Sequence, residues 1–115
     1  MPSRNARVLR HVVLFAFLPE TTPAEIASVE AAFAALPAQI PEIIDFEWGT
    51  DVSIEGRAQG FTHCFLVTFA DEAGRAAYLP HPAHQAFVEL VSKHREKGLV
   101  LDYWAHATAG RARRP

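Results

Sequence analysis

The sequence predicts an α+β domain of the ferredoxin-like type, with the order β-α-β-β-α-β and a four-stranded antiparallel sheet. Four apolar or alternating runs are typical of strands, and two apolar stripes at helical spacing each follow a proline. A chain of 115 residues suits one domain with its own core. We place this domain at residues 8–105 and expect flexible termini at 1–7 and 106–115.

The first expected strand, residues 8–18, is apolar on both faces. His11, Val13 and Phe15 share one face, whereas Val12 and Leu14 share the other. A strand of this kind is buried on both sides. One helix layer covers a single face, so a second copy of the chain is the economical cover for the other.

The first helix is expected to begin with a capping box. Thr22 is its N-cap, Pro23 takes the first helical position, and Glu25 completes the box. Apolar residues of the core then recur at helical spacing: Ile26, Val29, Phe33 and Leu36. Two prolines end this helix.

Residues 43–52 and 61–69 alternate as strands do. The first of these runs has an apolar face made of Ile44, Phe46 and Trp48. The second has an apolar face made of Phe61, His63, Phe65, Val67 and Phe69. Cys64 lies on its opposite face, where we expect a buried thiol.

Two helices and a strand complete the expected fold. Asp71 can cap a short helix that reaches Leu79, and Pro82 begins a second helix that we expect to end near Lys97. Gly98 then fits the position beyond a helix end, and residues 99–105 form the last strand.

Composition excludes several classes of function. A formal charge of −2 with mixed signs gives no basic surface for nucleic acid. The apolar run near the start is too short for a membrane span and lacks a cleavage site, so we expect a cytoplasmic protein. A single cysteine permits no internal disulfide, which is consistent with a reducing compartment.

The candidate site is centred on the stretch that precedes the second helix. His84 falls in the first helical turn, where a positive local potential favours a neutral ring and hence a general base. Tyr78 is its candidate hydroxyl partner. The alternative is that His81 and His84 are helix caps whose rings bond backbone groups.

His11 and His63 are each the polar exception on an apolar strand face. If both faces point to the helices, the two histidines and the Tyr78–His84 pair line one cavity for a small hydrophobic ligand. Its expected walls are apolar: Val13, Phe15, Phe33, Phe65, Val67 and Phe87. The alternative is a pair of hydrogen-bonded core histidines. A metal site at His81 and His84 is disfavoured because Pro82 separates them and no carboxylate lies beside them, and we expect no cofactor.

Five segments in this order resemble the stress-responsive α/β-barrel, or Dabb, family. They are residues 11–15 (His-Val-Val-Leu-Phe), 46–49 (Phe-Glu-Trp-Gly), 61–64 (Phe-Thr-His-Cys), 78–87 (Tyr-Leu-Pro-His-Pro-Ala-His-Gln-Ala-Phe) and 101–103 (Leu-Asp-Tyr). The resemblance implies a homodimer in which two sheets pack face to face as an α+β barrel. One branch of this family, the plant polyketide cyclases, carries out an intramolecular aldol cyclisation.

That branch implies roles for four residues: His84 as general base, Tyr78 as hydrogen-bond donor to an enolate, and His11 and His63 as orienting groups. Phe33 stands where the branch has a phenol, so one polar contact is missing. The sequence therefore supports two hypotheses. One is a cofactor-independent cyclase, lyase or isomerase acting on a hydrophobic carbonyl compound. The other is a non-catalytic stress-response dimer that binds a small hydrophobic molecule or acts only as a stable dimer.

Overall fold

The computed structural model describes residues 7–106, which contain one four-stranded antiparallel sheet and four helices. The strands are β1 (Leu9–Phe17), β2 (Ile43–Thr50), β3 (His63–Phe69) and β4 (Arg95–Trp104). The helices are α1 (Pro23–Ala34), α2 (Leu36–Gln39), α3 (Glu72–Tyr78) and α4 (Pro82–Ser92). The expected flexible termini fall mostly outside the described residues.

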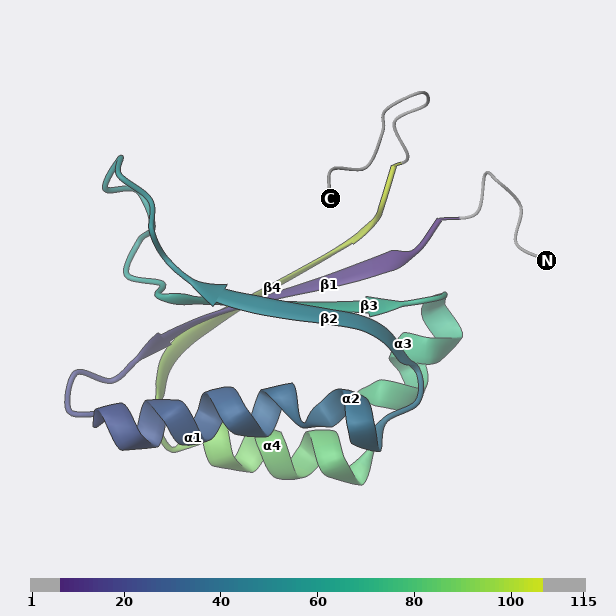
Figure 1. Ribbon diagram of the computed structural model, residues 1–115, viewed down its shortest axis with the longest axis horizontal. Helices are drawn as coiled ribbons and strands as arrows, with labels where there is room; N and C mark the ends of the chain where they lie inside the picture. Colours follow the sequence, from purple (N-terminus) through teal and green to yellow (C-terminus); the bar gives the residue numbers. More distant parts are fainter. Residues whose placement is uncertain (1–6, 107–115) are drawn as a thin grey trace.

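The strand order β2-β3-β1-β4 is that of a ferredoxin-like fold, as the sequence predicted. Helices α1 and α4 lie side by side under one face of the sheet, and α3 lies at one end (Figure 1). No helix among residues 7–106 is long and apolar enough to cross a membrane.

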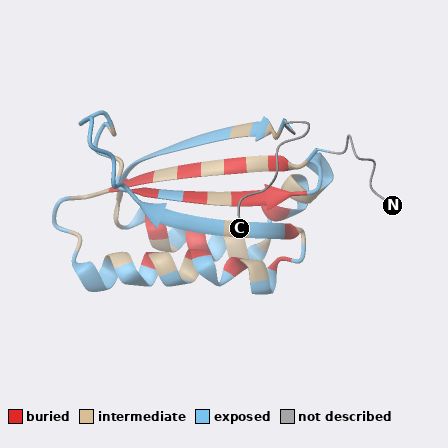
Figure 2. Ribbon diagram, turned by 45° about the horizontal axis from the view of Figure 1, so that its top comes forward, coloured by how far each residue is buried: buried red, intermediate tan, exposed pale blue. Residues whose placement is uncertain are grey.

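The core lies between the sheet and the helices. The two central strands alternate between buried and partly exposed residues, whereas the two outer strands are largely exposed (Figure 2). Phe33 of α1 and Phe65 of β3 stack with their ring centroids 4.4 Å apart, and both are almost fully buried. This packing fixes which strand face points to the helices.

The predicted helix from Pro82 to Lys97 is too long. Helix α4 ends at Ser92, because the chain turns there and the N–H groups of Lys93 and His94 donate back to Leu90 and Val91. Strand pairing then takes the following residues, with Arg95 opposite Phe17 of β1. Gly98 is therefore inside β4 and not at a helix end.

Two strand predictions also needed correction. A bulge between Ile43 and Asp45 turns Ile44 out of the alternation, so Ile43 is buried and Ile44 is 53% exposed. Cys64 is exposed and not buried, because its side chain lies on the face of the sheet turned away from the helices. Partial burial and the charge of Glu47 nevertheless raise the pKa of the Cys64 thiol.

Candidate functional site

A cavity of about 520 Å³ lies between the sheet and the α3–α4 segment. Its volume is in the range of small-molecule sites. Four of the predicted wall residues line it: Val13, Phe15, Phe33 and Phe87. The other two predicted wall residues, Phe65 and Val67, are completely buried in the core and do not line it.

Three of the four predicted polar residues meet at this cavity: His11 from β1, Tyr78 from the end of α3, and His84 from the first turn of α4. The ring centroids of Tyr78 and His84 are 4.3 Å apart, and those of Tyr78 and His11 are 5.7 Å apart. The short connection between α3 and α4 holds the first pair together. The ring of Tyr78 is therefore a neighbour of both histidine rings.

Tyr78 is 1% exposed, and this burial strongly raises the pKa of its phenol. The group therefore stays protonated and can donate a hydrogen bond. Among residues 7–106, no side chain or carbonyl accepts a hydrogen bond from this hydroxyl. Its proton is thus available to a ligand in the cavity.

His84 has a defined tautomer. Its Nδ1 atom lies 2.8 Å from the carbonyl oxygen of Leu79, and a carbonyl oxygen only accepts hydrogen bonds. Nδ1 therefore carries the proton, and Nε2 of the neutral ring is left as an acceptor. Burial lowers the pKa of His84, with a further lowering by His11 and His81, although the bond to Leu79 opposes it.

His81 is the N-cap of α4, and its Nδ1 atom accepts a hydrogen bond of 3.0 Å from the Ala83 N–H. The capping alternative thus describes His81. His84 also bonds a backbone group but lines the cavity at the same time. Within residues 7–106, no three His, Cys, Asp or Glu side chains gather as a metal-binding group.

Asp102 and Arg75 also line the cavity, although the sequence analysis gave neither residue a place in the site. One carboxylate oxygen of Asp102 lies 2.7 Å from Nδ1 of His11, and the other accepts a hydrogen bond of 2.8 Å from Arg75. Because a carboxylate accepts, Nδ1 of His11 donates to Asp102, and no group within residues 7–106 forms a hydrogen bond with its Nε2. The sequence carried no direct signal for this pair, because only the register His11 opposite Asp102 brings them together.

His63 is buried on the helix side of the sheet, as predicted, but does not reach the cavity. It pairs with Phe15 in the sheet, four residues along β1 from His11. Its Nε2 lies 2.7 Å from a carboxylate oxygen of Glu30, and its Nδ1 lies 2.8 Å from the Thr62 hydroxyl. Both ring nitrogens are therefore occupied, as in a hydrogen-bonded core histidine.

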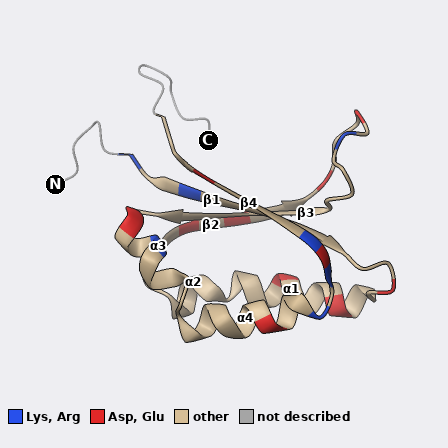
Figure 3. Ribbon diagram, turned by 180° about the vertical axis from the view of Figure 1, so that it is seen from behind, with Lys and Arg blue, Asp and Glu red and all other residues tan. Residues whose placement is uncertain are grey.

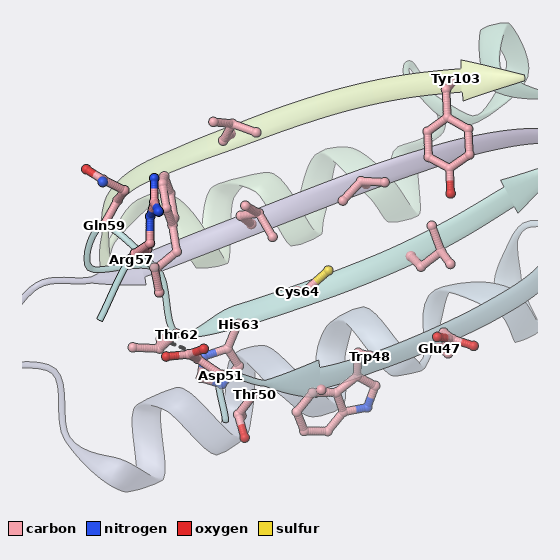
Figure 4. A pocket seen from close by; sticks show the side chains of 17 residues that line it. Glu47, Trp48, Thr50, Asp51, Arg57, Gln59, Thr62, His63, Cys64 and Tyr103 are labelled. Atoms are coloured by element: carbon pink, nitrogen blue, oxygen red, sulfur yellow. Dashed lines mark hydrogen bonds between the residues drawn. The ribbon is translucent and has the colours of Figure 1, made fainter. Parts of the chain in front are cut away.

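A second cavity, of about 740 Å³, lies on the opposite face of the sheet, beside the loop at residues 51–62. Figure 4 shows Cys64 and Tyr103 projecting from the face turned away from the helices. The floor is apolar and is formed by Val12, Leu14, Leu66 and Leu99. None of the three cavity residues His11, Tyr78 and His84 lines it.

The fold and the inner cavity define a small α+β protein of the ferredoxin-like class with a His/Tyr-lined pocket under its sheet. The family described as the stress responsive A/B barrel domain matches residues 9–105, and the chain belongs to this family.

Two curated relatives cover most of the chain. Stress-response A/B barrel domain-containing protein HS1 of Arabidopsis thaliana is 38% identical over 83% of this chain and 87% of its own length. Olivetolic acid cyclase of Cannabis sativa is 32% identical over 83% of this chain and 94% of its own length.

Solved structures share the fold. Hydroxynitrile lyase from Passiflora edulis has a TM-score of 0.84 at 28% identity, over 90% of this chain and 97% of the lyase chain. A dimeric ferredoxin-like protein of unknown function from Jannaschia sp. has a TM-score of 0.72 at 28% identity, over 84% and 97% of the two chains.

Proposed function

We propose that this protein is a cofactor-independent acid–base enzyme of the cyclase or lyase type, acting on a small hydrophobic carbonyl compound. The observation that carries the proposal is the pairing, at one cavity, of a neutral His84 with a free Nε2 and a protonated Tyr78. A neutral imidazole accepts a proton, and a phenol donates a hydrogen bond to an oxygen that gains charge.

The same pair serves two related reactions. In an aldol cyclisation, Nε2 of His84 removes a C–H proton, and the electron pair forms the new C–C bond. The attacked carbonyl oxygen then takes up that proton from Nε2 of His84, which returns the ring to its neutral form. In cyanohydrin cleavage, Nε2 removes the hydroxyl proton, the oxygen electron pair forms the carbonyl, and the C–C bond to cyanide breaks. In both reactions, Tyr78 donates a hydrogen bond to the substrate oxygen that carries negative charge.

His11 has a positioning role in this proposal. Its Nδ1 proton is directed to Asp102, so its Nε2 accepts a hydrogen bond from a substrate hydroxyl. His63 was expected to orient the substrate as well. The proposal gives it no such role, because Glu30 and Thr62 occupy its ring nitrogens.

The named activities of two relatives support this type of reaction, since one is a cyclase and the other a lyase. The proposal extends only the acid–base chemistry to this chain. The aromatic walls Phe15, Phe33 and Phe87 favour a compact apolar substrate.

We further propose that the chain forms a homodimer through the open face of its sheet. Leu99, Leu101 and Tyr103 of β4 are 44%, 58% and 44% exposed. They continue an apolar surface with Val12 and Leu14, which pair with Leu101 and Leu99. A large exposed apolar patch is typical of an interface, and the similar Jannaschia protein is described as dimeric.

The second candidate function is ligand binding without catalysis. It is favoured by the hydrogen bond from His84 to Leu79, which also ties α4 to the preceding connection. Both functions predict binding of an apolar compound in the cavity, but only the first predicts turnover.

The proposal is tested by incubating the protein with two model compounds, mandelonitrile and a linear poly-β-keto thioester. Formation of benzaldehyde or of a cyclised product above the buffer rate supports the enzyme. Binding of both compounds with neither product formed supports the non-catalytic alternative.

A further inference from the structure

The edge strand β4 contributes Arg95, Val100 and Asp102 to the lining of the cavity. Val100 pairs with Val13 and therefore faces the helices, yet it is 59% exposed. The helix layer thus leaves the β4 side of the cavity uncovered. A ligand can enter there and lie parallel to the strand.

Two arginines line this cavity, but their surroundings differ. Arg75 is paired with Asp102 at 2.8 Å and lies 4.0 Å from Glu72, so its charge is largely neutralised. Among residues 7–106, Arg95 has no carboxylate within 4.0 Å. Among the ionised lining residues Arg75, Arg95 and Asp102, one positive charge is in excess, and it lies on Arg95 because Asp102 pairs with Arg75.

The stem of Arg95 runs along the helix side of β4 toward the cavity. A Cβ added to Gly98 would lie 3.2 Å from Cδ of Arg95, so the glycine leaves room for this stem. Gly98 pairs with Phe15, and His11 lies four residues further along β1, about 13 Å away. The first three residues of β4, Arg95 to Lys97, are charged, and the strand then has no charged residue before Asp102 (Figure 3).

We propose that the cavity takes an amphipathic carbonyl compound whose anionic end binds Arg95, while its carbonyl end lies at Tyr78 and His84. The apolar stretch between the two ends packs on Phe15, Phe87 and Val100. Guanidinium binds carboxylates and phosphates through paired hydrogen bonds, so both are candidates for the anionic group. The assignment of the carbonyl end rests on the proposed function, whereas that of the anionic end does not.

The test is isothermal titration of the full chain with octanoate, octyl phosphate and neutral octanamide. The tighter of the two anions should bind wild type about tenfold or more better than octanamide, as expected for a hydrogen bond to a charged group. Arg95→Gln should abolish that preference and leave octanamide binding unchanged. Whether octanoate or octyl phosphate binds more tightly identifies the anionic group.

The matched control is Lys97→Gln, which removes one positive charge from the same end of β4. Lys97 bonds the Gln59 carbonyl oxygen and packs on Phe61, away from the cavity. It should keep the anion preference. Equal binding of all three ligands to wild type, an absence of binding, or equal losses in both variants would overturn the inference. If the protein prefers an anion but converts neither model compound, the anion site is supported and the proposed function is contradicted.

Discussion

The Nδ1 atom of His84 lies 2.8 Å from the carbonyl oxygen of Leu79, and this bond determines the chemistry of the ring. Because the carbonyl accepts, Nδ1 must donate, and Nε2 becomes the basic atom. Burial favours the neutral ring. His84 therefore bonds a backbone carbonyl, as the capping alternative expected, and also lines the cavity with Nε2 as its acceptor atom.

The tautomer of His84 gives the first prediction. In ¹⁵N-detected NMR at neutral pH, His84 should show a protonated Nδ1 and a bare Nε2. Its titration should also occur below the ordinary histidine pKa of 6.5, because burial disfavours the imidazolium. A protonated Nε2 at neutral pH would rule out the base assigned here.

The lowered pKa of His84 also predicts how stability depends on pH. In the unfolded chain the ring titrates near 6.5, whereas in the folded chain it titrates lower. Between these values the unfolded chain binds the extra proton, so stability is lost as the pH falls from 6.5 toward the folded pKa. Lowering the pH from about 7.5 to about 5.5 should therefore destabilise wild type more than His84→Gln, as measured by urea unfolding at each pH. Parallel losses would contradict the shift.

Asp102 should contribute to the stability of the fold. Asp102→Asn removes the charge between His11 and Arg75, and we expect a loss of about 1 to 3 kcal/mol in the free energy of unfolding. Glu96→Gln, which alters an exposed carboxylate of the same strand, should cost far less. Equal effects in urea titrations would show that the His11–Asp102 bond contributes nothing.

His63 should separate stability from ligand binding. His63→Ala leaves Glu30 without its partner, which we expect to cost about 1 to 3 kcal/mol. The cavity does not contain His63, so octanamide affinity should be unchanged in calorimetry. A parallel loss of affinity would place His63 in the site after all.

The open face of the sheet should support the dimer. Leu101→Glu places a charge at the middle of the apolar surface and should convert the dimer to a monomer in sedimentation experiments. Val52→Glu is the control, because Val52 is 87% exposed in a loop. A wild type that is monomeric at all concentrations would exclude the interface.

Strand periodicity was enough to predict the fold and the faces of β1 and β3. His11 and His63 both proved to be buried on the helix side, as the alternation indicated. The distance between them along the sheet could not be predicted from the sequence, because it depends on the strand register, which pairs His63 with Phe15. One strand face therefore serves two separate clusters.

The end of α4 shows a second limit of the sequence. Lys93, Arg95 and Lys97 followed by Gly98 read as a charged helix end, and local propensity favours that interpretation. Long-range pairing with β1 takes Arg95 and Lys97 into the sheet. Arg95 thereby reaches the cavity, and this position could not be predicted without the tertiary structure.

The most direct test of the proposed function compares initial rates on whichever model compound wild type converts faster. His84→Gln and Tyr78→Phe should each lower the rate by about 100-fold or more, as expected for the loss of general acid–base catalysis. His63→Ala, matched for folded fraction, should remain within about threefold of wild type. Rates for His84→Gln and Tyr78→Phe equal to that of His63→Ala would contradict an acid–base site at this cavity.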